Sequence, residues 1–164
     1  MDGGAGIDTL DYRTSTAAVN ANLATGSGLG GDADGDVFSN FERILGSSDN
    51  DTLTGDAERN VLFGRGGADV LDGGEGRDRL GGGSGNDTMS GGLGRDTFFF
   101  GAGNDKLDGG ADWDVALFSG DQVEFYVANS NRNSWTVTQI STGDTDILTN
   151  IEALQFSDGS LFNF

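Results

Sequence analysis

A nine-residue period runs without a gap from Gly46 to Leu117 and divides this stretch into eight units. The sixth place of each unit is Asp or Asn, and the eighth place is apolar. The sixth-place residues are Asp51, Asn60, Asp69, Asp78, Asp87, Asp96, Asp105 and Asp114, and the eighth-place residues are Leu53, Leu62, Leu71, Leu80, Met89, Phe98, Leu107 and Ala116. A fixed period of this kind predicts a solenoid, because each unit buries its apolar residue only by stacking on its neighbours.

Each unit divides into a glycine-rich loop of six residues and a short strand of three, as in GGSGNDTMS at 82–90. Glycine permits the backbone conformations that such a loop needs in order to curl and point its carbonyl oxygens inward. The middle residue of the strand faces the interior. Two units make one turn, so each loop lies above the loop two units later. The pattern therefore predicts an all-β fold, a right-handed parallel β-roll.

Composition restricts the partners and the chemistry of this chain. Its 27 acidic and 9 basic residues give a net charge of -18, which opposes compaction and disfavours nucleic acid and an anionic membrane surface as partners. Thirty glycines raise the entropy that is lost on folding. The chain has no Cys and no His, so oxygen atoms are the only strong metal ligands left. No apolar run is long enough for a membrane span.

Stacked loops bring their sixth-place aspartates to the same gap. Two carboxylates and several backbone carbonyls converging there supply roughly six oxygen ligands. Ca²⁺ tolerates the irregular geometry of such a set, whereas Mg²⁺ prefers a strict octahedron and keeps its waters. The sequence therefore predicts Ca²⁺ as the bound ion.

The units at 46–117 resemble the RTX (hemolysin-type) calcium-binding nonapeptide family of type I secreted bacterial proteins. The resemblance implies that two sixth-place side chains, the odd-placed carbonyls of one loop and the even-placed carbonyls of the loop two units later bind each ion. It gives six candidate sites in two stacks, which are Asp51, Asp69, Asp87 and Asp105 on one side and Asn60, Asp78, Asp96 and Asp114 on the other.

The carbonyl ligands implied by the resemblance belong to both stacks of loops. On the first side they are Gly46, Ser48, Gly64, Arg65, Gly66, Gly67, Gly82, Gly83, Ser84, Gly85, Gly101 and Gly103. On the second side they are Gly73, Gly74, Glu75, Gly76, Gly91, Gly92, Leu93, Gly94, Gly110 and Asp112. Asn60 and Asp112 depart from the pattern, so we expect the sites at the ends of the second stack to be weak or empty.

Two degenerate units precede the regular repeats, at 3–11 and 31–39. If the two sides continue to alternate, Asp8 stacks over Asp51 and Asp36 over Asn60, which adds up to two sites. The alternative is that these are acidic turns without an ion. The whole chain is then expected to bind about four to eight Ca²⁺ ions.

The two flanks resemble each other, because 34–45 and 144–155 share the pattern D-x-D, an apolar pair, Ser or Thr, Asn, an apolar residue and Glu. Alternating apolar residues at 123–128 and 134–140 predict a hairpin. We interpret 1–45 as an N-terminal flank, 46–117 as the roll and 118–164 as a C-terminal cap, all within one domain. Atypical ends cover the exposed core and sheet edges of a solenoid.

These observations favour a secreted, extracellular bacterial calcium-binding module that folds when it binds calcium and stabilises an attached catalytic or adhesive domain of a type I secretion substrate. No nucleophile elbow or metalloprotease motif is present, so the module itself is not expected to be an enzyme. One alternative is the accessory module of a polysaccharide-modifying enzyme such as an alginate epimerase or lyase, or of a protease or lipase. Another is a polysaccharide-binding or adhesin module, with Trp113, Trp135, Tyr126 and the arginines as contacts.

Overall fold

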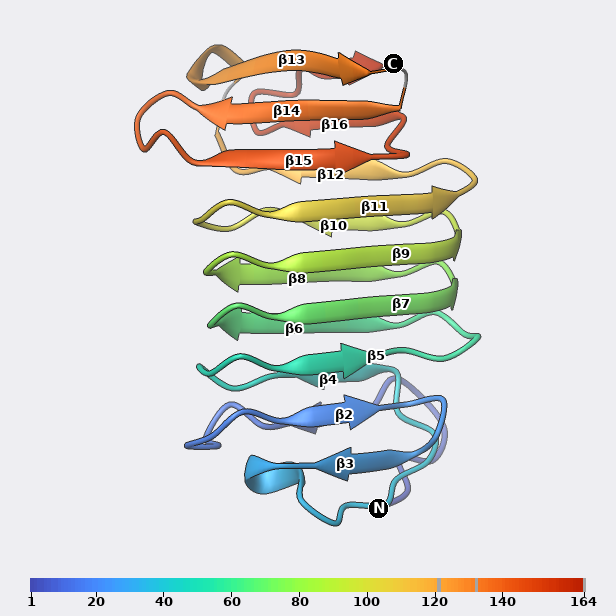
Figure 1. Cartoon of the computed structure of the whole chain (residues 1–164). Helices are drawn as coiled ribbons and strands as arrows, with labels where there is room; N and C mark the ends of the chain where they lie inside the picture. Colours follow the sequence, from blue (N-terminus) through green and yellow to red (C-terminus); the bar gives the residue numbers. More distant parts are fainter. Residues whose placement is uncertain (121, 132, 164) are drawn as a thin grey trace.

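The repeats stack into one continuous roll in a computed structural model that describes residues 1–120, 122–131 and 133–163 (Figure 1). Within the repeats, successive strands alternate between two sheets that face each other across a narrow interior. No helix among the described residues is long and apolar enough to cross a membrane. The predicted all-β fold, a parallel β-roll, is confirmed.

The first sheet has the spatial order β1-β4-β6-β8-β10-β12-β16-β17. Its strands are β1 (Thr9–Asp11), β4 (Arg43–Leu45), β6 (Val61–Gly66), β8 (Arg79–Ser84), β10 (Thr97–Phe99), β12 (Val115–Phe118), β16 (Ala153–Phe156) and β17 (Leu161–Asn163). All its neighbouring strands are parallel except β16 and β17.

The second sheet has the order β13-β14-β15-β11-β9-β7-β5-β2-β3. Its strands are β2 (Asn20–Asn22), β3 (Ser27–Leu29), β5 (Thr52–Thr54), β7 (Val70–Gly76), β9 (Thr88–Gly94), β11 (Lys106–Ala111), β13 (Phe125–Asn131), β14 (Ser134–Gln139) and β15 (Thr145–Thr149). Two short 3-10 helices, Gly31–Ala33 and Gln122–Glu124, lie in the flanks.

The nine-residue period sets the register of the parallel strands. Val70 pairs with Thr88, and Val61 pairs with Arg79, so within the repeats each strand pairs with the strand 18 residues later. This is the turn of two units that the sequence predicted. As a result, identical places of alternate units lie directly above one another.

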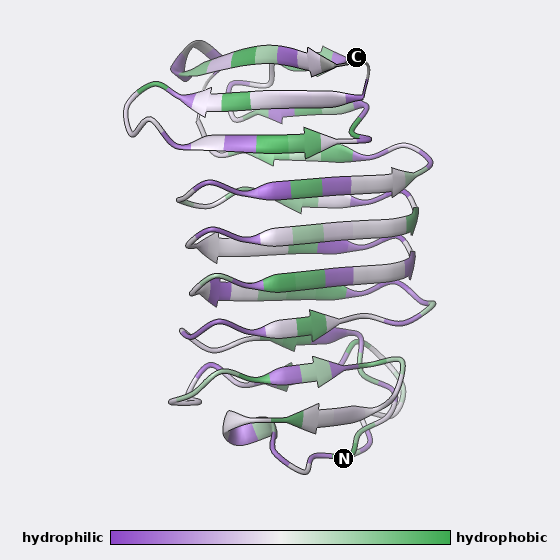
Figure 2. Cartoon of the chain, viewed as in Figure 1, coloured by the Kyte–Doolittle hydropathy of each residue, from purple (hydrophilic) through white to green (hydrophobic). Residues whose placement is uncertain are grey.

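The eighth-place side chains fill the interior between the sheets. Leu53, Leu62, Leu71, Leu80, Met89, Phe98, Leu107 and Ala116 are all 2% exposed or less. In Figure 2 the hydrophobic residues concentrate in the strands, whereas hydrophilic residues line the loops at the two edges. The core is one residue wide on each sheet, so burial depends on contact between successive turns.

The C-terminal flank contains the predicted hairpin, which β13 and β14 form as an antiparallel pair. The same flank returns to the roll through β15, which pairs in parallel with β11, and through β16, which pairs in parallel with β12. An aromatic cluster packs under it, because the ring of Phe118 lies 4.2 Å from Phe100, 5.1 Å from Phe125 and 5.3 Å from Phe156. The flank therefore covers the last complete turn of the roll.

Candidate metal centre

The sixth-place side chains form two columns, one along each edge of the roll. In the first column the backbone N–H of Asp51 donates to Oδ1 of Asp69 at 2.8 Å, and Asp69 repeats this contact to Asp87 at 2.9 Å. Asp87 in turn donates to Oδ1 of Asp105 at 2.9 Å. Each carboxylate is thus held against the loop one turn earlier, which is the stacking that the sequence predicted.

The second column has the same geometry. The backbone N–H of Asn60 donates to Oδ1 of Asp78 at 2.8 Å, Asp78 donates to Asp96 at 2.8 Å, and Asp96 donates to Asp114 at 2.8 Å. Only one carboxylate oxygen of each aspartate is occupied by this contact.

The second oxygen of six of these aspartates is buried without a hydrogen-bond partner. The orphaned atoms are the Oδ2 atoms of Asp69, Asp78, Asp87, Asp96, Asp105 and Asp114, and these side chains are at most 1% exposed. A buried carboxylate oxygen without a partner is costly, so such groups pair with a cation or take up a proton. Six such atoms, three in each column, indicate a repeated requirement for a ligand.

The pKa values of these carboxyl groups show the same imbalance. Burial raises the pKa of Asp69, Asp78 and Asp114 to about 7; a backbone hydrogen bond opposes the shift, and the next carboxylates of the column add to it. Burial likewise raises the pKa of Asp105 to about 6. Stacked carboxylates in this position disfavour their own charge unless a cation offsets it.

A first-place glycine leaves open the space beside five of the six orphaned oxygens, whereas the unit of Asp105 has Phe100 at this place. A Cβ on Gly73 would lie 2.6 Å from Oδ2 of Asp78 and 2.6 Å from the carbonyl oxygen of Gly91 in the next turn. Both distances are shorter than any real Cβ contact, so a side chain here would displace one of the two oxygens. A carboxylate oxygen of one loop and a carbonyl oxygen of the following loop therefore face the same point.

The even-placed residues give the loops their curl. They have positive φ angles at Arg65, Gly67, Gly74, Gly76, Gly83, Gly85, Gly92, Gly94, Gly103, Gly110 and Asp112. A change of φ sign at every second residue turns successive carbonyls in opposite directions, so each loop presents carbonyls to both of its neighbours. Arg65 and Asp112 adopt the same conformation without being glycine, which is strained for residues that carry a Cβ.

Within the described part of the chain, no three acidic side chains meet at one point. A cation between two turns would therefore contact two carboxylates, and backbone carbonyls would supply the remaining oxygens. Hard oxygen donors in an irregular cradle fit Ca²⁺, whereas softer metals would require the imidazole or thiolate ligands that the chain lacks.

Sequence reasoning missed Asp146, which extends the first column by one turn. The backbone N–H of Asp105 donates to its Oδ1 at 3.0 Å, the side chain is 8% exposed, and burial raises its pKa to about 7. The loop at 141–146 and β15 form a ninth unit, with Leu148 buried at the eighth place. The signal in the sequence is STGDTDILT, which the hairpin separates from the other repeats.

The expected positions of Asp8 and Asp36 are wrong. Strand β1 pairs with β4, so Asp8 lies beside Glu42 in the second column and does not stack over Asp51, whose Oδ1 instead accepts the N–H of Val19 at 2.8 Å. Asp36 does not stack over Asn60, because β4 pairs with β6 and places Glu42 there; Asp36 instead accepts a hydrogen bond from the hydroxyl of Tyr12 at 3.0 Å. The segment between β1 and β4 includes the pair β2 and β3, which breaks the simple alternation of units.

The fold and the two acidic columns define a β-roll whose stacked loops bring carboxylate and carbonyl oxygens together. The profile of the RTX calcium-binding nonapeptide repeat family matches the chain at residues 45–80, 77–107 and 101–117. The repeat region from residue 45 to residue 117 thus belongs to the RTX calcium-binding nonapeptide repeat family. No curated protein matches the chain.

Proposed function

We propose that this chain is a module that folds around two columns of Ca²⁺ ions, one along each edge of the roll. The observation that carries this proposal is the set of six buried Oδ2 atoms without partners, one in each of the last six repeat units. Asp69, Asp87, Asp78 and Asp96 each belong to two consecutive gaps. The regular extension through Asp105 and Asp146 adds a seventh gap to the six that the repeats contain.

The biological role that fits this chemistry is folding on export. Where calcium is scarce, the charge of -18 and the glycine content oppose folding. Where calcium is abundant, its binding energy becomes folding energy, because the unfolded chain has no preformed sites. We infer a secreted bacterial module that is exported unfolded by a type I system and that stabilises an attached catalytic or adhesive domain once outside.

The replacement Asp87→Asn tests the columns at the level of a single residue. Asparagine keeps an acceptor for the N–H of Asp69 but removes a charge from two gaps, so the calcium concentration at half-folding should rise at least about tenfold, which corresponds to about 1.4 kcal/mol. A calcium titration followed by circular dichroism measures this. The matched control is Asp72→Asn, which removes the same charge from an exposed strand position and should leave the midpoint almost unchanged. Equal shifts in the two variants would contradict the column assignment.

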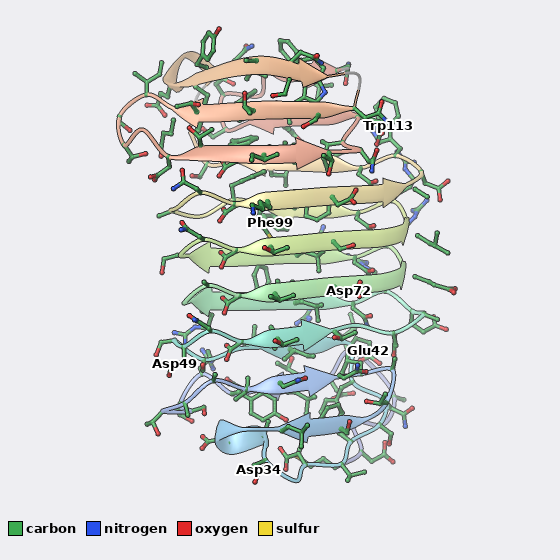
Figure 3. All side chains as sticks on the ribbon, in the orientation of Figure 1. Asp34, Glu42, Asp49, Asp72, Phe99 and Trp113 are labelled. Carbon is green, nitrogen blue, oxygen red and sulfur yellow. The ribbon has the colours of Figure 1, made fainter. Side chains whose placement is uncertain are left out.

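A second candidate function, binding of an acidic polysaccharide, is favoured by a row of arginines along one edge. Arg59, Arg77 and Arg95 occupy the fifth place of successive loops, one per turn, and Trp113 occupies the same place in the next loop. The fifth places at the opposite edge are Asn50, Ala68, Asn86 and Asn104. Figure 3 shows Trp113 at one edge of the roll and Asp49 at the opposite edge.

These arginines form no ion pair within the described part of the chain, where the only ion pair joins Arg13 and Asp11. Arg59, Arg77 and Arg95 are exposed and, together with Arg79, line a hollow of 240 Å³. Guanidinium groups bind carboxylates in a bidentate manner, and the row repeats at about the 4.8 Å spacing of neighbouring strands. A linear polymer with one carboxylate per sugar unit would match such a row.

The double variant Arg59→Gln/Arg77→Gln tests this second function. Its affinity for short oligogalacturonates at saturating calcium should fall about tenfold, measured by isothermal titration calorimetry. The matched control is Arg13→Gln/Arg65→Gln, which removes two arginines from other positions. A similar loss in both variants would show that net charge alone attracts the oligosaccharide and would reject the arginine row as a binding site.

A further inference from the structure

The second acidic column contains an Asp–Glu pair at each end, and both glutamates lie outside the regular repeats. The backbone N–H of Asp114 donates to Oε2 of Glu152 at 2.7 Å, and that of Asp8 donates to Oε2 of Glu42 at 2.9 Å. In return, the backbone N–H groups of Glu152 and Glu42 donate to the carbonyls of Asp114 and Asp8 at 3.2 and 3.3 Å. The same Asp–Glu arrangement therefore occurs twice, at opposite ends of the roll.

A left-handed asparagine lies two residues before each glutamate. Asn150 has a φ of 51° and Asn40 a φ of 57°. A Cβ added to Gly109 would collide with the carbonyl oxygen of Asn150, and one added to Gly3 would collide with that of Asn40. The asparagine carbonyl therefore takes the position that the first-place carbonyl of the next loop occupies between regular turns, as Gly91 does over Gly73.

Hydrogen bonds from the side chains hold both asparagines in this conformation. The amide of Asn150 donates to Asp108 at 2.7 Å, and the amide of Asn40 donates to Asp2 at 2.8 Å. A left-handed backbone is unfavourable for a residue with a Cβ, although asparagine tolerates it better than most. Its presence at the equivalent place of both flanks indicates that the direction of the carbonyl matters.

Each of these arrangements encloses a carboxylate oxygen without a partner. Asp114 is 0% exposed, and its Oδ2 accepts no hydrogen bond. A Cβ on Gly109 would lie 2.6 Å from this oxygen, so Oδ2 points into the same space as the carbonyl of Asn150. The Oδ2 atom of Asp8 is likewise buried without a partner. A buried carboxylate oxygen without a partner needs a cation or a proton, and the neighbouring carbonyl oxygen and second carboxylate at each end favour a cation.

We propose that both ends of the second column are Ca²⁺ sites of a different kind from those between the repeats. The C-terminal Glu site consists of Asp114, Asn150 and Glu152, and the N-terminal Glu site consists of Asp8, Asn40 and Glu42. This inference rests on the proposed calcium function and adds residues outside the matched repeat region. Calcium bound at these sites would also connect both flanks to the roll.

The Glu sites should bind calcium more weakly than the sites between repeat loops. Asn150 and Glu152 are separated by one residue, whereas the first and sixth places of a repeat loop are separated by four. The shorter connection offers fewer carbonyls, and the longer glutamate side chain replaces part of the loop. Water then completes the six to eight oxygen ligands that Ca²⁺ prefers. The ions at the ends should therefore dissociate first when calcium is lowered.

The replacements Glu152→Gln and Glu42→Gln separate a cation site from a purely structural cap. Glutamine retains a side-chain oxygen that accepts the N–H of Asp114 or Asp8, so a cap would be preserved, whereas a cation site would lose a charge. Native mass spectrometry of the full chain at saturating calcium should show one ion fewer in each variant and two fewer in the double variant. Circular dichroism at the same calcium concentration verifies that the roll is folded.

The control is Glu58→Gln, which removes the same charge from an exposed position and should bind as many ions as the parent chain. If Glu152→Gln and Glu42→Gln also keep the full number, the Glu sites are caps and the inference is overturned. If the unmodified chain binds no calcium, the proposed function itself fails. The two failures are thus distinguished by the unmodified chain.

Discussion

In the presence of a chelator, the chain should lose most of its β-sheet signal and should regain it when Ca²⁺ is added. Seven gaps filled by Ca²⁺ contribute +14 against a charge of -18, which leaves about -4. Each site contributes about 2.7 kcal/mol to folding at a calcium concentration one hundred times its Kd. Without these contributions, a core one residue wide has to offset the ordering of 30 glycines. Circular dichroism at increasing free calcium measures the transition.

Two control titrations separate coordination from screening. Sodium chloride at high concentration screens the carboxylates but does not enter the gaps, so it should restore little of the β signal. Mg²⁺ should substitute poorly, because it retains its waters and prefers a regular octahedron. A chain that is fully folded in chelator, or that folds equally well in sodium chloride, would contradict calcium-driven folding.

The period of the repeats determines most of the fold that the sequence could predict. Once two units make a turn, the pairing of Val70 with Thr88 and the contact of Asp69 with Asp87 both follow from a separation of 18 residues. The interior is equally predictable, because the eighth place is the only strand position that is apolar in every unit. The period gives the position of each unit relative to its neighbours, so it predicts the stacking only where the units follow one another without an insertion.

The positions that were missed or misplaced lie where the count is interrupted. The hairpin of β13 and β14 separates Asp146 from the repeats, although Asp146 occupies the next turn of the first column. On the N-terminal side, the consecutive strands β2 and β3 both lie in the second sheet, so the alternation that placed Asp8 over Asp51 was wrong. Glu42 and Glu152 were noticed as a shared pattern of the flanks, but their place in the second column depends on pairing that the local sequence does not specify.

Strand pairing explains why the C-terminal flank matters to the whole roll. Without β15 and β16, the backbones of β11 and β12 would form open edges, and Phe118 would lose its contacts with Phe125 and Phe156. Open strand edges with an exposed apolar face associate with other chains. The same flank also supplies Asp146, which completes the last gap of the first column. The flank therefore pairs with the edges of β11 and β12, packs aromatic rings against Phe118 and supplies a carboxylate to the first column.

Removal of residues 119–164 should consequently abolish cooperative folding with calcium, although all eight repeats remain. The truncated chain keeps most of its aspartates, so residual calcium binding should be weak and the protein should form oligomers through the bare edges of β11 and β12. Calcium titration by circular dichroism, together with light scattering, measures both effects. Within the intact chain, Phe156→Ala should raise the calcium midpoint, whereas Tyr126→Ala, at a position 67% exposed, should not. A truncated chain that stays monomeric and folds at the original calcium concentration would show that the flank is not a cap, and its exposed aromatics would then be better explained as a surface for a partner.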